Sequence, residues 1–87
     1  MYEFHKKING VDFYAPSTNK NKKYDAYINN KKFSFGSRFY QQFFDRIGFY
    51  SVLNNYDEKR RANYRARHKH DKLNEYSSGY FSYYYLW

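Results

Sequence analysis

The sequence predicts an α+β domain in which two β-hairpins form a small antiparallel sheet, followed by two to three short helices. Two tight-turn signals, Asn9-Gly10 and Asn29-Asn30, each lie between segments of alternating apolar and polar residues. Further along the chain, apolar residues recur at helical spacing instead. The length of 87 residues suits one small domain, residues 1–87.

Residues 2–15 are expected to form the first hairpin, because asparagine and glycine both tolerate the positive φ that a two-residue turn requires. This turn places apolar side chains mostly on one face of the hairpin and polar side chains on the other. The predicted cross-strand pairs are Ile8 with Val11, Lys6 with Phe13, Phe4 with Ala15, Lys7 with Asp12, and His5 with Tyr14.

Residues 24–35 repeat this pattern around Asn29-Asn30. The predicted pairs are Tyr24 with Phe35, Ala26 with Phe33, Tyr27 with Lys32, and Asp25 with Ser34. The hairpins are joined by a polar connector after Pro16, and this connector contains three lysines, Lys20, Lys22 and Lys23. These lysines either contact phosphate or form a solvated loop.

Residues 38–47 are predicted to form the core helix that covers the sheet, with Ser37 as its cap and Gly48 as its stop. The apolar arc of this helix contains Phe39, Tyr40, Phe43, Phe44 and Ile47. The opposite arc contains Arg38, Gln41, Gln42, Asp45 and Arg46. Phe39, Phe43 and Ile47 are therefore assigned a structural role in the core.

Residues 56–69 are predicted to form a basic helix, because Asn55 with Glu58 three positions later resembles a capping box. The helical wheel has no apolar stripe. It places one group of basic residues outward, where they would bind a polyanion or a partner protein: Arg61, Arg65, His68 and Lys69. Arg60 and Arg67 lie beside Tyr64, so these three are assigned structural roles, with the arginines paired to Asp25 or Asp45. The alternative is a merely solvated charged face.

Residues 79–87 form an aromatic tail, either a short helix capped by Ser77 or Ser78, or a strand. Part of this tail should dock on the sheet or the core helix. The remaining aromatic residues would form an interface with a partner, since a monomer seldom exposes such a patch. The residues assigned to this interface are Tyr80, Tyr83, Tyr84 and Trp87.

The composition favours a binding protein over an enzyme. The net charge of +8 favours anionic partners, and the absence of cysteine excludes disulfides and thiolate metal sites. His68 and His70 are two positions apart, where helical side chains point in different directions, so we expect no metal site. No catalytic residues, cofactor or small-molecule substrate are predicted, and no apolar run approaches the ~18 residues of a membrane span. We expect a soluble protein.

Several residue patterns between positions 23 and 87 are similar to a small uncharacterised family of nucleocytoplasmic large DNA viruses. They are Tyr24-x-x-Tyr27, Lys31-Lys32, Phe35-Gly36, Ile47-Gly48-Phe49-Tyr50-Ser51, Asp57-x-x-Arg60-Arg61-x-x-Tyr64-x-x-Arg67-His68, Phe81-Ser82 and Leu86-Trp87. The basic run is the most specific of these. The resemblance implies a viral context rather than a mechanism.

The sequence thus predicts a non-enzymatic structural or interaction protein, a minor capsid or virion component that bridges larger viral proteins. Tyrosine and arginine are enriched at protein interfaces, and the aromatic tail favours this function. The expected location is the virion, and the host cell interior during assembly. The alternative is a genome-associated protein that binds nucleic acid through Arg61, Arg65, Lys69 and the lysines of the connector.

Overall fold

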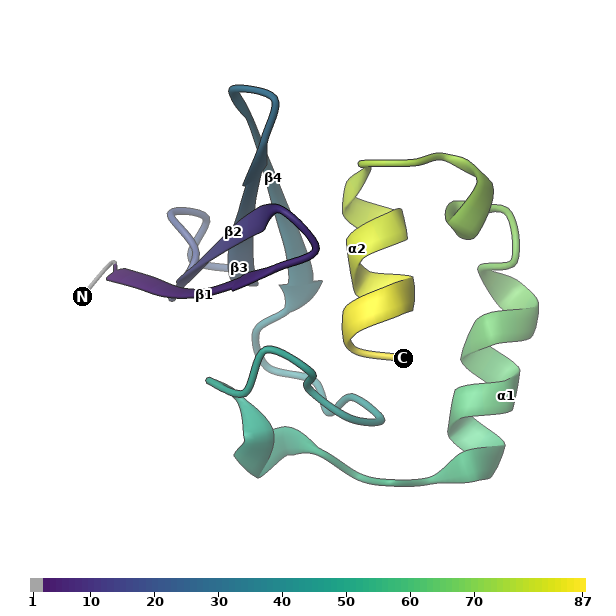
Figure 1. Ribbon diagram of the computed structural model, residues 1–87. Helices are drawn as coiled ribbons and strands as arrows, with labels where there is room; N and C mark the ends of the chain where they lie inside the picture. Colours follow the sequence, from purple (N-terminus) through teal and green to yellow (C-terminus); the bar gives the residue numbers. More distant parts are fainter. Residues whose placement is uncertain (1–2) are drawn as a thin grey trace.

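The computed structural model describes residues 3–87 and confirms the α+β fold (Figure 1). Four antiparallel strands form one sheet in chain order: β1 Glu3–Ile8, β2 Val11–Ala15, β3 Lys22–Ile28 and β4 Lys31–Ser37. The helices are α1 Glu58–Arg67 and α2 Ser78–Tyr85, with short 3-10 turns at η1 Ser51–Leu53 and η2 Asp71–Leu73. In the described part of the chain, neither helix has the length and apolar character needed to cross a membrane.

The predicted register of the second hairpin is confirmed. Asn29 and Asn30 have φ values of 54° and 60°, and all four predicted pairs of β3 with β4 are present. In the first hairpin, the pairs formed by Ile8, Lys7 and Lys6 are also as predicted. A β-bulge between Phe4 and Lys6 then shifts the register.

The bulge makes two predicted pairs of the first hairpin wrong. Phe4 pairs with Tyr14 instead of Ala15, and His5 does not pair with Tyr14. The Phe4 side chain is 53% exposed, with its ring centre 5.6 Å from that of Tyr14. Residue 2, at the start of the predicted hairpin, lies outside the described residues.

The core is aromatic and lies between the sheet and α2. The ring of Phe13 on β2 lies 6.0 Å from Phe35 on β4, and 6.1 Å and 4.8 Å from Phe81 and Tyr85 on α2. Figure 1 shows α2 between the sheet and α1, so the C-terminal helix occupies the place predicted for residues 38–47. The prediction that the tail docks is confirmed, and its helical alternative is correct.

The prediction of a core helix over residues 38–47 is wrong. This segment is irregular; Phe39 is 75% exposed, whereas Gln42 and Asp45, assigned to the polar arc, are buried. The Asp45 carboxylate accepts hydrogen bonds from the backbone N–H groups of Ile47 and Tyr50, at 2.9 Å and 2.8 Å. A side chain that binds nearby backbone N–H groups replaces the helical hydrogen bonds. Ile47 is buried as predicted.

Candidate functional site

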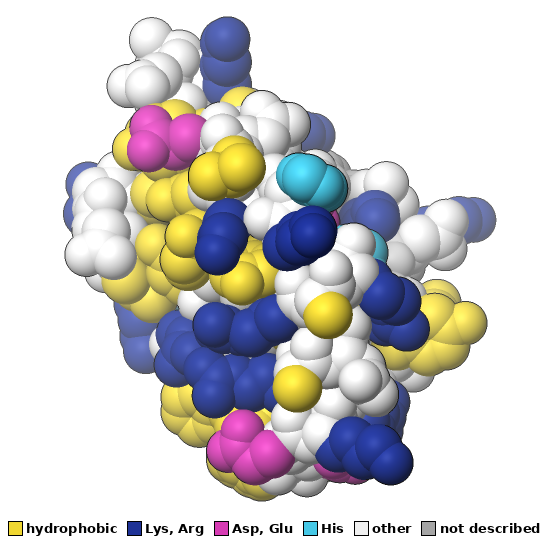
Figure 2. Space-filling model, turned by 90° about the vertical axis from the view of Figure 1, so that its right-hand side faces the viewer, with side chains coloured by type: hydrophobic (Ala, Val, Ile, Leu, Met, Phe, Trp, Pro, Cys, Tyr) yellow, Lys and Arg dark blue, Asp and Glu magenta, His cyan; other side chains and the backbone are white. Residues whose placement is uncertain are grey.

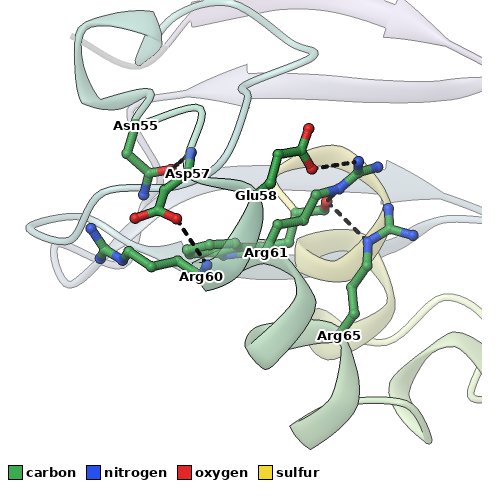
Figure 3. A network of polar contacts seen from close by, with 7 residues as sticks. Asn55, Asp57, Glu58, Arg60, Arg61 and Arg65 are labelled. Atoms are coloured by element: carbon green, nitrogen blue, oxygen red, sulfur yellow. Dashed lines mark hydrogen bonds and ion pairs between the residues drawn. The ribbon is translucent and has the colours of Figure 1, made fainter.

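Helix α1 begins two residues later than the sequence predicts. The side chain of Asp57, not that of Asn55, is the N-cap and accepts a hydrogen bond from the Arg60 N–H at 3.1 Å. Asn55 instead accepts from the Asp57 N–H at 2.8 Å (Figure 3). Tyr56 has a φ of 53°, which lies outside the helical range and keeps the helix from starting there.

Arg61 and Arg65 are half-buried and contact the domain, so the prediction that both point fully outward is wrong. Both Nε atoms donate to the main-chain oxygen of Trp87, at 2.9 Å and 3.2 Å. The Arg61 guanidinium also lies 4.6 Å from the centre of the Phe43 ring. Trp87 lies beyond the C-cap residue of α2, Leu86, and its oxygen accepts from the two arginines of α1 (Figure 3).

Arg60 and Arg67 are exposed, so their predicted structural role is also wrong. Arg60 donates from Nη1 to Gln41 Oε1 at 2.9 Å. Within residues 3–87, the Arg67 side chain has no hydrogen bond or ion pair. The two carboxylates predicted as their partners are satisfied elsewhere. Asp25 accepts from Ser17, Thr18 and Ser34, and Asp45 accepts from Tyr24 and from backbone N–H groups.

The other residues of the predicted basic site are dispersed. Lys69 and Lys20 are exposed, and His68 is half-buried, with its ring stacked on Tyr64 at 4.1 Å and its Nδ1 3.0 Å from Asp71 Oδ2. Tyr64 has the structural role predicted for it, since it also stacks on Trp87 at 4.5 Å and donates to Ser82 at 3.2 Å. The predicted outward arc does not form one surface.

Lys23 is buried, so it is not part of a solvated loop. Only 2% of the residue is exposed, and its ammonium group donates to the main-chain oxygens of Ser37 and, at 2.7 Å, of Tyr40. Burial lowers the pKa of Lys23 to about 8, although the negative charge of Asp45 acts in the opposite direction. The neighbouring Lys22 is half-buried, with its ammonium group uncommitted within residues 3–87.

The predicted aromatic interface of the tail is only partly exposed. Tyr83 is buried, with 6% of the residue exposed, and the Arg65 guanidinium lies 4.9 Å from its ring centre. Tyr80 and Trp87 are half-buried, whereas Tyr84 is 40% exposed. Placing Tyr83 at an interface is therefore wrong, because the side of α2 that carries it packs inside the domain.

Most of the exposed aromatic side chains lie instead on the segment between the sheet and α1. We define the arginine–aromatic face as Phe43, Phe44, Arg46, Tyr56 and Arg61. Tyr56 is 62% exposed, and its ring centre lies 5.9 Å from Phe44 and 6.3 Å from Phe43. The Arg46 guanidinium lies 5.8 Å from the Phe44 ring centre. Figure 2 shows basic side chains among hydrophobic ones on the side of the molecule that α1 occupies.

A cleft of about 560 Å³ separates α1 from the end of β4, the segment that follows it, and α2. Arg60, Asn63, Tyr64 and Arg67 line the cleft from α1, at the spacing of one helical stripe. The other lining residues include Lys22, Lys23, Phe35, Tyr40, Gln41, His68, Asp71, Ser82, Leu86 and Trp87. Its volume lies within the range of small-molecule sites.

The buried polar groups that hold the segment between β4 and α1 in place are not evident from the spacing of residues in the sequence. The Tyr24 hydroxyl donates to Asp45, and accepts from the Phe49 N–H at 2.9 Å. Gln42 Nε2 donates to the Tyr50 oxygen at 2.9 Å and to Asn54 Oδ1 at 2.7 Å. Asp45 could have indicated a turn instead of a helix here, because aspartate favours turns, where its side chain binds nearby backbone N–H groups.

The comparisons with known proteins give no name to this site. No family model, curated protein or solved structure matches the chain. Among residues 3–87, no group of three or more His, Cys, Asp or Glu side chains is arranged so that it could hold a metal ion. The site is therefore interpreted from its geometry and charge.

Proposed function

We propose that this chain is a non-enzymatic structural protein that bridges larger proteins, and that the arginine–aromatic face is its docking surface. The observation that carries the proposal is the clustering of Phe43, Phe44 and Tyr56 beside the guanidinium groups of Arg46 and Arg61. Aromatic residues and arginine are the types enriched at protein interfaces, where they often supply most of the binding energy.

The segment that carries this face is held by hydrogen bonds to the end of α2 and to Asn54. The Phe44 N–H donates to the Leu86 oxygen at 3.1 Å, and the Arg46 N–H donates to the Tyr85 oxygen at 3.0 Å. The Asp45 N–H, between them, donates to Asn54 Oδ1 at 2.8 Å. A surface that is already ordered before binding loses less entropy when a partner docks, so these contacts favour affinity.

The charge of the chain indicates the chemistry of the partner. A net charge of +8 favours a protein surface rich in Asp and Glu. The Arg46 Nε donates to the Tyr84 oxygen at 2.9 Å, and the terminal nitrogens of this guanidinium can still form a bidentate pair with a carboxylate. We therefore propose an acidic surface on the larger protein.

The viral setting of the proposal is supported by the sequence pattern from Asp57 to His68 and by the other patterns shared with the large DNA virus family. In that setting the partner is a capsid protein, and the chain is a minor component of the virion that reaches the particle during assembly in the host cell. The expectation that the chain lacks catalytic activity belongs to the same proposal.

The test is incorporation of the chain into purified virus particles, quantified by mass spectrometry. A double variant, Phe44→Ser with Tyr56→Ser, removes two rings of the face. We expect at least tenfold lower incorporation than for the natural chain. Val52→Ser is the matched control, because Val52 is 91% exposed and lies outside the face. Absence of the natural chain from particles, or normal incorporation of the double variant with circular dichroism unchanged, would contradict the proposal.

A further inference from the structure

We propose that the cleft between α1 and α2 binds a nucleoside phosphate, either as a free nucleotide or as part of a single strand. This site differs from the arginine–aromatic face. Of the residues assigned to nucleic acid from the sequence, it contains Lys22 and Lys23 but neither Arg61 nor Arg65. The inference does not rest on the bridging function. It follows from the charge of the cleft, from cations without partners, and from an aromatic wall.

The charge that lines the cleft is predominantly positive. Four side chains of this lining, Lys22, Lys23, Arg60 and Arg67, are basic. Asp71 is the single carboxylate among the lining residues, and it already lies 3.0 Å from the His68 ring nitrogen. The four basic side chains outnumber this one carboxylate, so the cleft attracts anions.

Two of these cations are not committed to partners in the described part of the chain. The side chains of Lys22 and Arg67 make no hydrogen bond or ion pair within residues 3–87, and the Arg60 side chain donates there only to the neutral Gln41 amide. A guanidinium group presents paired donors that match the oxygens of a phosphate. Lys23 contributes a further positive charge from the floor of the cleft, where burial disfavours that charge unless an anion is near.

The remaining wall of the cleft is aromatic and apolar. Tyr64 and Trp87 stack with their rings 4.5 Å apart and only 9° from parallel, and Phe35 and Leu86 also line the space. Tyr40, another lining residue, is 73% exposed, so its ring is available to a ligand. Bases stack favourably on aromatic side chains, whatever their sequence. Phosphate-binding cations beside an aromatic wall favour an anion that carries a ring, rather than inorganic phosphate alone.

Trp87 reports on this cleft directly, because it is the single tryptophan of the chain. The experiment follows its fluorescence in low salt while the intact protein is titrated with four probes: adenosine monophosphate, a six-residue deoxyadenylate oligomer, adenosine, and inorganic phosphate. We expect saturable quenching by the nucleotide or the oligomer, and at least tenfold weaker binding of adenosine and of phosphate. Oligomer binding at least tenfold tighter than that of the mononucleotide identifies a strand as the ligand; equal affinity identifies a free nucleotide.

Two variants with the same change of charge test the site itself. Arg67→Gln removes an exposed cation of the cleft and should weaken binding at least tenfold, while the circular dichroism spectrum stays unchanged. Lys69→Gln removes an exposed cation that does not line the cleft and should bind like the natural chain. The proposal is overturned by any of three results: no saturable quenching by either nucleotide probe, inorganic phosphate binding as tightly as the nucleotide, or equal losses in the two variants.

Discussion

Replacing Tyr24 with phenylalanine tests whether one buried hydroxyl anchors the irregular segment to the sheet. Tyr24 is fully buried on β3, and its hydroxyl donates to the Asp45 carboxylate. The same oxygen accepts from the N–H groups of Phe49 at 2.9 Å and Tyr50 at 3.3 Å. Tyr24→Phe keeps the ring, which stacks on Phe35 with 5.6 Å between centres, and removes only these polar contacts.

The expected loss follows from what each partner retains. A hydrogen bond to a charged group contributes roughly 1.5–3 kcal/mol, and this bond disappears. The Tyr50 N–H still donates to Asp45 at 2.8 Å, whereas the Phe49 N–H loses its acceptor. That part-buried donor adds about 1 kcal/mol, the lower end of the usual penalty, because water can reach it. We therefore expect a loss of about 3 kcal/mol, from a total stability of roughly 4–13 kcal/mol for a domain of this size.

Equilibrium urea unfolding measures this loss. With a slope of about 1.5 kcal/mol per molar urea, the midpoint should fall by about 2 M. Tyr84→Phe is the control, because its ring is 40% exposed and its hydroxyl has no hydrogen bond within residues 3–87. The same midpoint for Tyr24→Phe and the natural chain would refute the anchoring role.

A pH series gives a second readout of the same group. Burial, with smaller contributions from Asp45, raises the pKa of Tyr24 far above its usual value. A raised pKa in the folded state stabilises the fold below the unfolded value of about 10, and this stabilisation is lost as the pH rises further. The difference in stability between the natural chain and Tyr24→Phe should therefore shrink above pH ~10. A constant difference would contradict the assignment.

Three further substitutions test other parts of the structure. Burial lowers the pKa of Lys23 to about 8 in the folded chain, whereas the pKa of an unfolded lysine is about 10.4. Between these two pH values the unfolded chain binds more protons than the folded chain, so stability rises with pH. The urea midpoint of the natural chain should rise from pH 8 to 10 relative to Lys23→Met, and parallel profiles would count against a buried ammonium group. Gly36 has a φ of 78°, and an added Cβ would lie 2.7 Å from the side chain of the buried Leu86. Gly36→Ala should therefore lower the free energy of unfolding by about 2–4 kcal/mol and the Tm by about 10 °C or more. An unchanged Tm would contradict this strain. Arg61→Gln removes a hydrogen bond to the Trp87 oxygen and should lower the free energy of unfolding, measured in urea, by about 1.5 kcal/mol. The control Arg60→Gln should lower it by less than ~0.5 kcal/mol. Equal losses would contradict the structural role of Arg61.

The hairpins could be predicted because residues close together in the sequence determine them. The turns at Asn9-Gly10 and Asn29-Asn30 set the register of the neighbouring residues, and the alternation of side chains does the rest. The bulge after Phe4 could not be predicted, since an unpaired residue leaves no mark on the alternation until the partner strand is placed. The predicted register is therefore correct near the turn and wrong at the far end of β1, beyond the bulge.

The segment 38–47 shows where periodicity fails. Its apolar residues fit a helical arc, but a wheel assumes that polar side chains face water. Asp45 and Gln42 are buried because backbone N–H and carbonyl groups of the same region satisfy them. These contacts form only in this loop conformation, and the spacing of apolar residues carries no information about that conformation. The aromatic rings displaced from the core then become the exposed face.

The wheel of α1 separated Arg61 and Arg65 from Arg60 and Arg67 correctly, but it assigned the two pairs to the wrong sides. With no apolar stripe, the helix gave no sign of which side meets the domain, and the deciding contact is the Trp87 oxygen, more than twenty residues later in the chain. Arg61 and Arg65 thus hold the helix, while Arg60 and Arg67 line the cleft. Because the bridging face and the cleft use different sides of α1, Arg67→Gln should leave incorporation into particles unchanged. Loss of both activities in this variant would show that the two surfaces are one site.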